Sequence, residues 1–138
     1  MIYKKEKGQA MVEFALILVP LLILIGGIID FGWIFYHKVI VNNAAREGAR
    51  YAAIHSKDTT YETDTESLIN GILPPTLIKG ANPISVDKDS PAAGDITVSV
   101  KGDVDILTPF ISMIFIDSNP GRNGIQLGIT STTIMKME

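Results

Sequence analysis

Hydrophobic residues fill the first third of the chain and give way to alternating patterns in the rest. Residues 14–29, FALILVPLLILIGGII, contain no charged side chain, and Glu13 and Asp30 stand directly on either side. Extended through Tyr36, this run is long enough as a helix to cross a hydrocarbon core of roughly 30 Å. The pattern predicts a transmembrane helix over residues 9–36.

A cleaved secretory signal peptide is the alternative interpretation of this run. The run exceeds the usual signal-peptide core of about 7–15 residues, and no A-x-A-like site follows it closely. Lys4, Lys5 and Lys7 precede the run. Because short basic flanks stay in the cytoplasm, we expect a single pass through the cytoplasmic (inner) membrane, with residues 37–138 as the exported domain.

The helical pattern continues beyond the apolar run, to about His55. At about 100° per residue, small side chains gather in one sector of this segment, a stripe made of Val41, Ala44, Ala45, Gly48, Ala49 and Ala52. We expect an amphipathic extension of the first helix that packs through this face. Pro20 removes a backbone donor inside the run, which predicts a kink near Leu16.

The remaining sequence predicts a small sheet and one more helix. A polar loop leads to a short helix from about Asp64 to Leu73, which Pro74 and Pro75 end. Alternation predicts a hairpin over residues 84–106 and a closing strand from about residue 125. Residues 108–117 fit a short helix or a strand. The composition of NPGRNG predicts a turn. The expected fold class is α+β, with the long helix packed on a small antiparallel sheet.

Composition narrows the possible chemistry. Twelve basic and fifteen acidic residues give a net charge of −3 without a basic patch, so nucleic-acid binding has no electrostatic footprint. The sequence offers no cysteine nucleophile, phosphate-cradling loop or serine–histidine–acid set, and we expect neither an enzyme nor a cofactor. Arg46 and Arg50 form a basic ridge beside Glu47, which fits a solvated face or a contact with lipid headgroups or another subunit.

Two groups of side chains are candidate metal ligands. His37 and His55 lie about 27 Å apart on one helix, so they cannot share an ion. Asp87, Asp89 and Asp95 crowd the expected hairpin turn, but Pro91 occupies a position where an EF-hand requires a ligand. We interpret these aspartates as a solvated turn and expect no metal site.

The start of the chain carries the most specific pattern. Lysines, Gly8, a short uncharged stretch, Glu13 and then an apolar helix are arranged as in a prepilin. This resemblance implies that a prepilin peptidase cuts between Gly8 and Gln9 on the cytoplasmic side. Residues 1–8 would be the leader, and Glu13 would become the fifth residue of the mature chain.

The resemblance narrows to TadE-like proteins, pseudopilin-type minor subunits of the Flp (tight adherence) pilus system. The matching features are GQA-V-EFAL-L-P, DFG followed by an aromatic pair, NAAREGARYAA and the terminal MKME. The family implies a minor pilin that is incorporated into the pilus or assists its assembly. Its implied partners are the prepilin peptidase, other pilin-like subunits, the assembly machinery and the lipid bilayer.

Glu13 needs a physical reason to lie beside an apolar span. A charge near the bilayer centre costs about 2.5–3.5 kcal/mol on insertion scales. Glu13 and Asp30 are roughly 26 Å apart along a helix, so both can sit near opposite interfaces and merely frame the span. The functional hypothesis is that Glu13 contributes to peptidase recognition and sets subunit register by pairing with the new Gln9 amine of a neighbour.

An alternative function from a different class also fits the pattern. The chain would then be an uncleaved single-span envelope protein whose exported domain binds a partner or a ligand. The N-terminus of the mature chain distinguishes the two, since it begins at Gln9 in the first case and at Met1 in the second.

Overall fold

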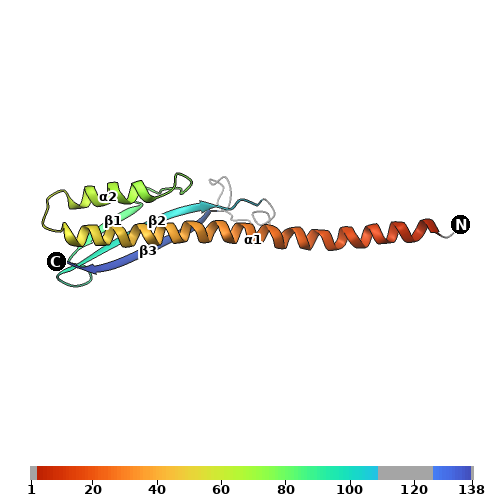
Figure 1. Cartoon of the computed structure of the whole chain (residues 1–138), viewed down its shortest axis with the longest axis horizontal. Coiled ribbons are helices and arrows are strands. Elements are labelled where there is room, and N and C mark those ends of the chain that lie inside the picture. Colours follow the sequence, from red (N-terminus) through yellow and green to blue (C-terminus); the bar gives the residue numbers. More distant parts are fainter. Residues whose placement is uncertain (1–2, 109–125, 138) are drawn as a thin grey trace. The chain divides into compact units, whose positions relative to one another are not determined.

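The computed structural model describes residues 3–108 and 126–137. Its elements are, in chain order, α1 (Tyr3–Ile54), α2 (Tyr61–Ile72), β1 (Ile84–Lys88), β2 (Asp95–Asp105) and β3 (Gln126–Lys136) (Figure 1). The strands form one antiparallel sheet in the order β1-β2-β3. A long apolar helix, a second helix and a small antiparallel sheet confirm the expected α+β class.

Contacts divide the chain into two compact units. The first unit contains α1 up to Gly32 together with residues 106–108, and the second contains Trp33–Asp105 and residues 126–137. The long helix contributes residues to both, and it stays helical through Pro20. The kink at Pro20 stays a prediction.

The sheet follows the predicted alternation closely. Ile84 pairs with Val100 at one end of the β1–β2 ladder, and Asp95 pairs with Lys136 at one end of the β2–β3 ladder. Alternate residues of β2 are buried from Ile96 to Val104, as a half-buried strand requires. The hairpin and the closing strand are thus confirmed, whereas NPGRNG and all but the first residue of 108–117 lie outside the described residues.

The second helix begins earlier than predicted, at Tyr61 rather than near Asp64. Acidic side chains at Glu62 and Asp64 favour a helix N-terminus, and the Thr60 hydroxyl donates to an oxygen of Asp64 at 2.9 Å. The ring of Tyr61 is buried, so packing also draws this residue into the helix. The polar composition of residues 61–64 predicts a loop. These residues are helical because their acidic side chains lie in the first turn of α2, where they are favourable.

The core of the second unit is built from small residues of α1 and branched residues of the sheet. Val41, Ala44, Ala45, Ala49 and Ala52 are fully buried in one cluster that also holds the following side chains: Ile69, Leu73, Leu77, Ile84, Ile96, Val98, Val100, Val104 and Ile129. Gly48 is buried as well. The five residues expected to form the packing face, Ala44, Ala45, Gly48, Ala49 and Ala52, thus all lie inside the domain.

Gly48 marks the closest approach between α1 and α2. A Cβ atom added there would lie 2.5 Å from Ile69 Cδ1 and 2.8 Å from Ile69 Cγ1. Atoms do not approach this closely, and Ile69 is fully buried and cannot swing into solvent. The small-residue stripe therefore accommodates α2 as well as the sheet.

Substituting Gly48 by alanine tests this contact. We expect Gly48→Ala to lower the free energy of unfolding by roughly 1–2 kcal/mol, because steric overlap outweighs the gain in helix propensity. Gly71→Ala in α2 is the matched control, since no atom lies within 4 Å of its added Cβ. It should raise that free energy by about 0.5–1 kcal/mol. Chemical denaturation of the full chain in detergent micelles measures both, and stabilisation by Gly48→Ala would contradict the packing.

The hydroxyl of Tyr61 lies in a setting that disfavours its ionisation. It donates to Glu62 Oε1 at 2.8 Å, and the side chain is only 9% exposed. Burial, followed by the hydrogen bond to Glu62 and the charges of Glu62, Asp89 and Asp87, raises the pKa of Tyr61 to about 12. The ordinary tyrosine pKa is about 10.

This shift predicts a loss of stability at alkaline pH. The folded chain holds the Tyr61 proton more tightly than the unfolded chain, so the contribution is complete below about pH 10 and is lost as pH rises to about 12. We expect a decline on the order of 1–2 kcal/mol from this group. Tyr61→Phe keeps the ring and should remove that part of the decline. Denaturation at several pH values measures it, and an identical decline in both proteins would refute the assignment.

Candidate functional site

The candidate site is the exposed N-terminal half of α1. Among the described residues, one helix is long and apolar enough to cross a membrane, and 6% of its most apolar 18-residue window is buried. Met11 is 75% exposed, Phe14 67% and Leu16 73%. Leaving so much apolar surface in water is unfavourable, at about 25 cal/mol per Å². The helix therefore fits a membrane anchor.

The residues of the expected cleavage site lie on the open surface of this helix. Gly8, Gln9 and Glu13 are all exposed, and no atom lies within 4 Å of a Cβ added to Gly8. Gln9 and Glu13 are one helical turn apart, and Gln9 Nε2 donates to Glu13 Oε1 at 3.1 Å. The described surroundings of Glu13 thus supply a neutral donor from its own chain.

Asp30 has the opposite environment. It is 3% exposed, and its Oδ1 accepts hydrogen bonds from the backbone N–H groups of Leu107 at 3.0 Å and Thr108 at 3.1 Å. The Thr108 hydroxyl donates to the other carboxylate oxygen. The sequence pattern places Asp30 at the end of the apolar run and does not reveal these partners, because they lie 77 and 78 positions away.

His37 connects α1 to the segment that follows α2. Its ring is fully buried, with Nδ1 2.9 Å from the Trp33 carbonyl oxygen and Nε2 2.8 Å from Thr76 Oγ1. A carbonyl oxygen only accepts, so Nδ1 donates, and in the neutral ring Nε2 accepts from the Thr76 hydroxyl. Both nitrogens are used within the fold, which gives His37 a packing role.

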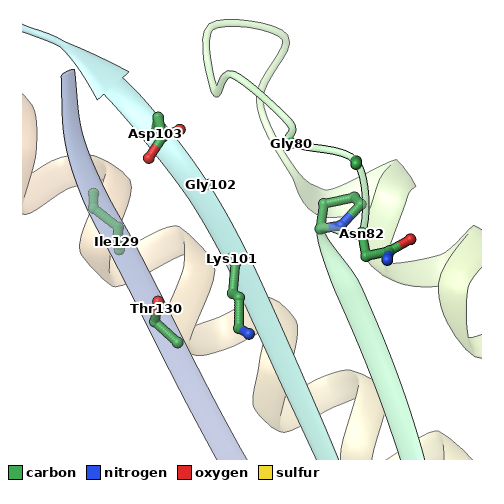
Figure 2. A pocket seen from close by; sticks show the side chains of 9 residues that line it. Gly80, Asn82, Lys101, Gly102, Asp103, Ile129 and Thr130 are labelled. Carbon is green, nitrogen blue, oxygen red and sulfur yellow. The ribbon is translucent and has the colours of Figure 1, made fainter. Parts of the chain in front are cut away.

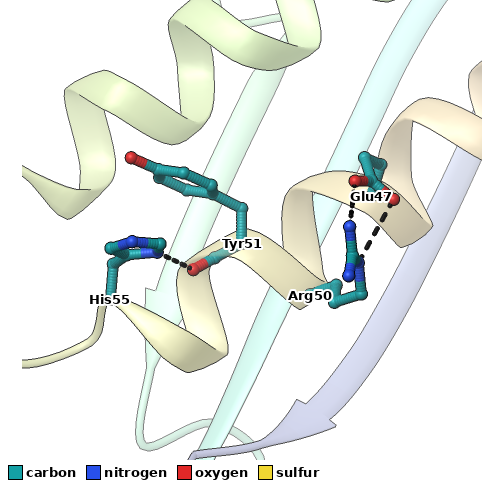
Figure 3. A network of polar contacts seen from close by, with 4 residues as sticks. All are labelled: Glu47, Arg50, Tyr51 and His55. Atoms are coloured by element: carbon teal, nitrogen blue, oxygen red, sulfur yellow. Dashed lines mark hydrogen bonds and ion pairs between the residues drawn. The ribbon is translucent and has the colours of Figure 1, made fainter.

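The exposed ridge of α1 is held by local contacts (Figure 3). Arg50 Nη2 lies 2.6 Å from Glu47 Oε1, and both side chains remain substantially exposed. The hydrogen bond from Arg50 lowers the pKa of Glu47, and the bond to Glu47 raises the pKa of Arg50. His55 Nδ1 lies 3.0 Å from the Tyr51 carbonyl oxygen, and the two rings stack. The exposed ion pair between Glu47 and Arg50 contributes little to stability.

Asp89 stabilises the hairpin turn through its own side chain. Asp89 has φ of 58°, and its Oδ1 accepts a hydrogen bond from the Gly94 N–H at 2.8 Å. Within residues 3–108 and 126–137, no group of three histidines, cysteines or acids is arranged to hold a metal ion. Asp87 and Asp95 flank this turn from the ends of β1 and β2.

A surface pocket of about 250 Å³ lies where the segment before β1 meets β2 and β3 (Figure 2). Two charged residues, Lys101 and Asp103, are among its nine lining residues, beside Asn82 and Thr130. Gly102 is buried there under Leu77, whose Cγ would lie 2.6 Å from an added Cβ. Among the described residues, no hydrogen bond links the Thr130 hydroxyl to Lys101 or Asp103, so the pocket supports no catalytic assignment.

In the described part of the chain, an exposed apolar helix joined to a small α+β domain fits the class of proteins that are anchored in a membrane by one helix. Within that class, the family model described as TadE-like protein matches residues 8–50. The match starts at Gly8 and includes Glu13, Asp30 and most of the buried stripe, which confirms the resemblance over the helix that carries it. The family is structural and pilus-associated, which suggests a Tad pilus-associated protein. No curated protein and no solved structure matches the chain.

Proposed function

We propose that this chain is a minor pilin, or pseudopilin, of Flp-type pilus biogenesis. It is anchored in the cytoplasmic membrane by α1, cleaved after Gly8 by a prepilin peptidase, and incorporated into the pilus or engaged in its assembly. The observation that carries the proposal is the family match, which begins at Gly8 and follows α1 to residue 50. The chain then divides into a leader (1–8), a span (9–36) and an exported domain (37–138).

The exposed apolar surface of α1 is compatible with both proposed locations, the membrane and the assembled helix bundle. Lipid covers it in the membrane, and neighbouring helices cover it in an assembled bundle. Lipid tails are as apolar as leucine side chains, so the exchange between these environments involves little hydrophobic free energy. A subunit can therefore leave the bilayer for a bundle, whereas exposure to water would be strongly unfavourable.

The position of Gly8 suits a protease substrate. It is exposed in the first turns of α1, where few backbone hydrogen bonds must open before the chain can adopt an extended form. Glycine itself weakens the helix there by roughly 0.5–1 kcal/mol relative to alanine. The lysines before it keep this end in the cytoplasm, on the side where the peptidase acts.

Glu13 is the charge that assembly uses in this proposal. Its partner within the chain is the neutral amide of Gln9, which leaves the negative charge uncompensated. Cleavage creates an ammonium group on Gln9, and hydrogen bonds between charged groups are roughly twice as strong as neutral ones. A neighbour's ammonium therefore competes well for Glu13 and fixes the axial position of one subunit against the next.

Cleavage is tested by the mass of the mature chain. We expect the wild-type protein to begin at Gln9, and Gly8→Leu to leave a chain that begins at Met1. Gly32→Leu is the matched control, because no atom lies within 4 Å of an added Cβ at either glycine. It should be cleaved normally. Mass spectrometry of membrane fractions determines the first residue of the wild type and of both variants. A wild-type chain that begins at Met1 would favour the uncleaved envelope protein instead.

The role of Glu13 is tested by separating cleavage from assembly. Glu13→Ala should reduce the protein recovered in sheared surface filaments about tenfold or more, as the loss of roughly 1.4 kcal/mol implies, while sparing cleavage to a greater extent. Glu13→Gln keeps an acceptor for Gln9 without the charge, so it should assemble as poorly. Quantitative immunoblots of both fractions give the ratio. Wild-type recovery of either variant would remove Glu13 from subunit register.

A further inference from the structure

Gly26 and Asp30 lie one turn apart on the same face of α1, and both face the residues that follow β2. Asp30 receives three hydrogen bonds from Leu107 and Thr108, as described above. A Cβ added to Gly26 would lie 3.4 Å from Thr108 Cγ2 and 3.7 Å from Thr108 Cβ. Gly26 thus leaves room for Thr108 to lie against the helix, and the Asp30 carboxylate binds it there.

This contact lies at the C-terminal end of the apolar run, inside the candidate span of residues 9–36. Gly26 belongs to the uncharged stretch of residues 14–29, four positions before Asp30. The backbone donors of Leu107 and Thr108 are satisfied by Asp30, which removes much of the cost of placing them in an apolar medium. The same bonds compensate the Asp30 carboxylate, whose burial without partners would be costly.

The exposure of apolar side chains near this contact indicates a lipid environment. Leu107 is 54% exposed, and Ile29, which precedes Asp30 in α1, is 52% exposed. Both apolar side chains are therefore exposed close to Asp30, inside the candidate span.

We propose that Leu107 and Thr108 are a second membrane-contacting segment, inserted beside α1 in the outer leaflet and held there by Asp30. The partner is the acyl-chain region of the bilayer, which receives the Leu107 side chain. This inference rests on the membrane anchoring by α1 that the proposed function requires. It assigns Asp30 to a bond within the chain and Glu13 to a bond between chains.

Depth in the bilayer is the first test. The chain contains no cysteine, so single cysteines at Leu107, Leu21 and Ser85 can carry a nitroxide label on the full chain in phosphatidylcholine vesicles. We expect the labels at 107 and 21 to collide more with oxygen than with a water-soluble nickel chelate, and the label at 85 to show the reverse.

The outcomes separate this inference from the proposed function. If the label at 21 lies in lipid while the label at 107 behaves like that at 85, the inference is wrong and α1 remains an anchor. If the label at 21 is itself in water, the anchoring fails and the inference fails with it.

A disulfide tests the contact independently of lipid. The Cβ separation of 3.7 Å between positions 26 and 108 falls within the range for disulfides. Gly26→Cys/Thr108→Cys should form an intramolecular bond with copper phenanthroline in the vesicles, whereas Gly32→Cys/Thr108→Cys should not. Adding Asp30→Ala should slow this bond about tenfold, and Asp30→Asn less, since its amide oxygen still accepts. No bond at 26–108, or equal rates in the alanine variant, would overturn the assignment.

Discussion

The close approach that small residues allow along α1 is the constraint on which the folded domain depends. A helix carrying alanines and Gly48 lets Ile69 of α2 and the branched residues of β2 fill the space that longer side chains would occupy. The sheet has three strands and α2 has twelve residues, so neither is large enough to bury its own apolar side chains. The stripe on α1 supplies the surface that completes the core.

The same helix presents a second surface, which is made of large apolar side chains. The difference between the two surfaces explains why one part of α1 packs in the domain while the other is exposed. Small residues are buried in the C-terminal part, from Val41 to Ala52, whereas leucines and isoleucines are exposed in the N-terminal part. Small side chains permit a fixed contact within the fold. Large ones would suit the exchange of lipid for neighbouring helices that the proposed function requires, because both environments are apolar.

Periodicity along the sequence was enough to predict most of the fold. The apolar run and the stripe gave α1, and alternation at Ile96, Val98 and Val100 gave the central strand. The start of α2 was misplaced because Thr60 and Asp64 stabilise a first turn through local bonds that no hydrophobic period records. The partners of Asp30 were missed for a related reason. A contact between positions 30 and 108 leaves no trace in any local pattern, and only the fold brings those residues together.

The two carboxylates that bracket the apolar run show how environment assigns different roles to the same chemical group. Asp30 is buried and its hydrogen bonds are met by residues of its own chain, so little is left for a partner to gain. Glu13 is exposed and holds one neutral donor, so an added cation gains a full charge-assisted bond. The sequence pattern allows the two carboxylates to lie near opposite interfaces, and it suggests a functional role for Glu13 only. The contacts indicate that Asp30 organises the subunit, and they leave Glu13 as the carboxylate through which the proposed assembly would act.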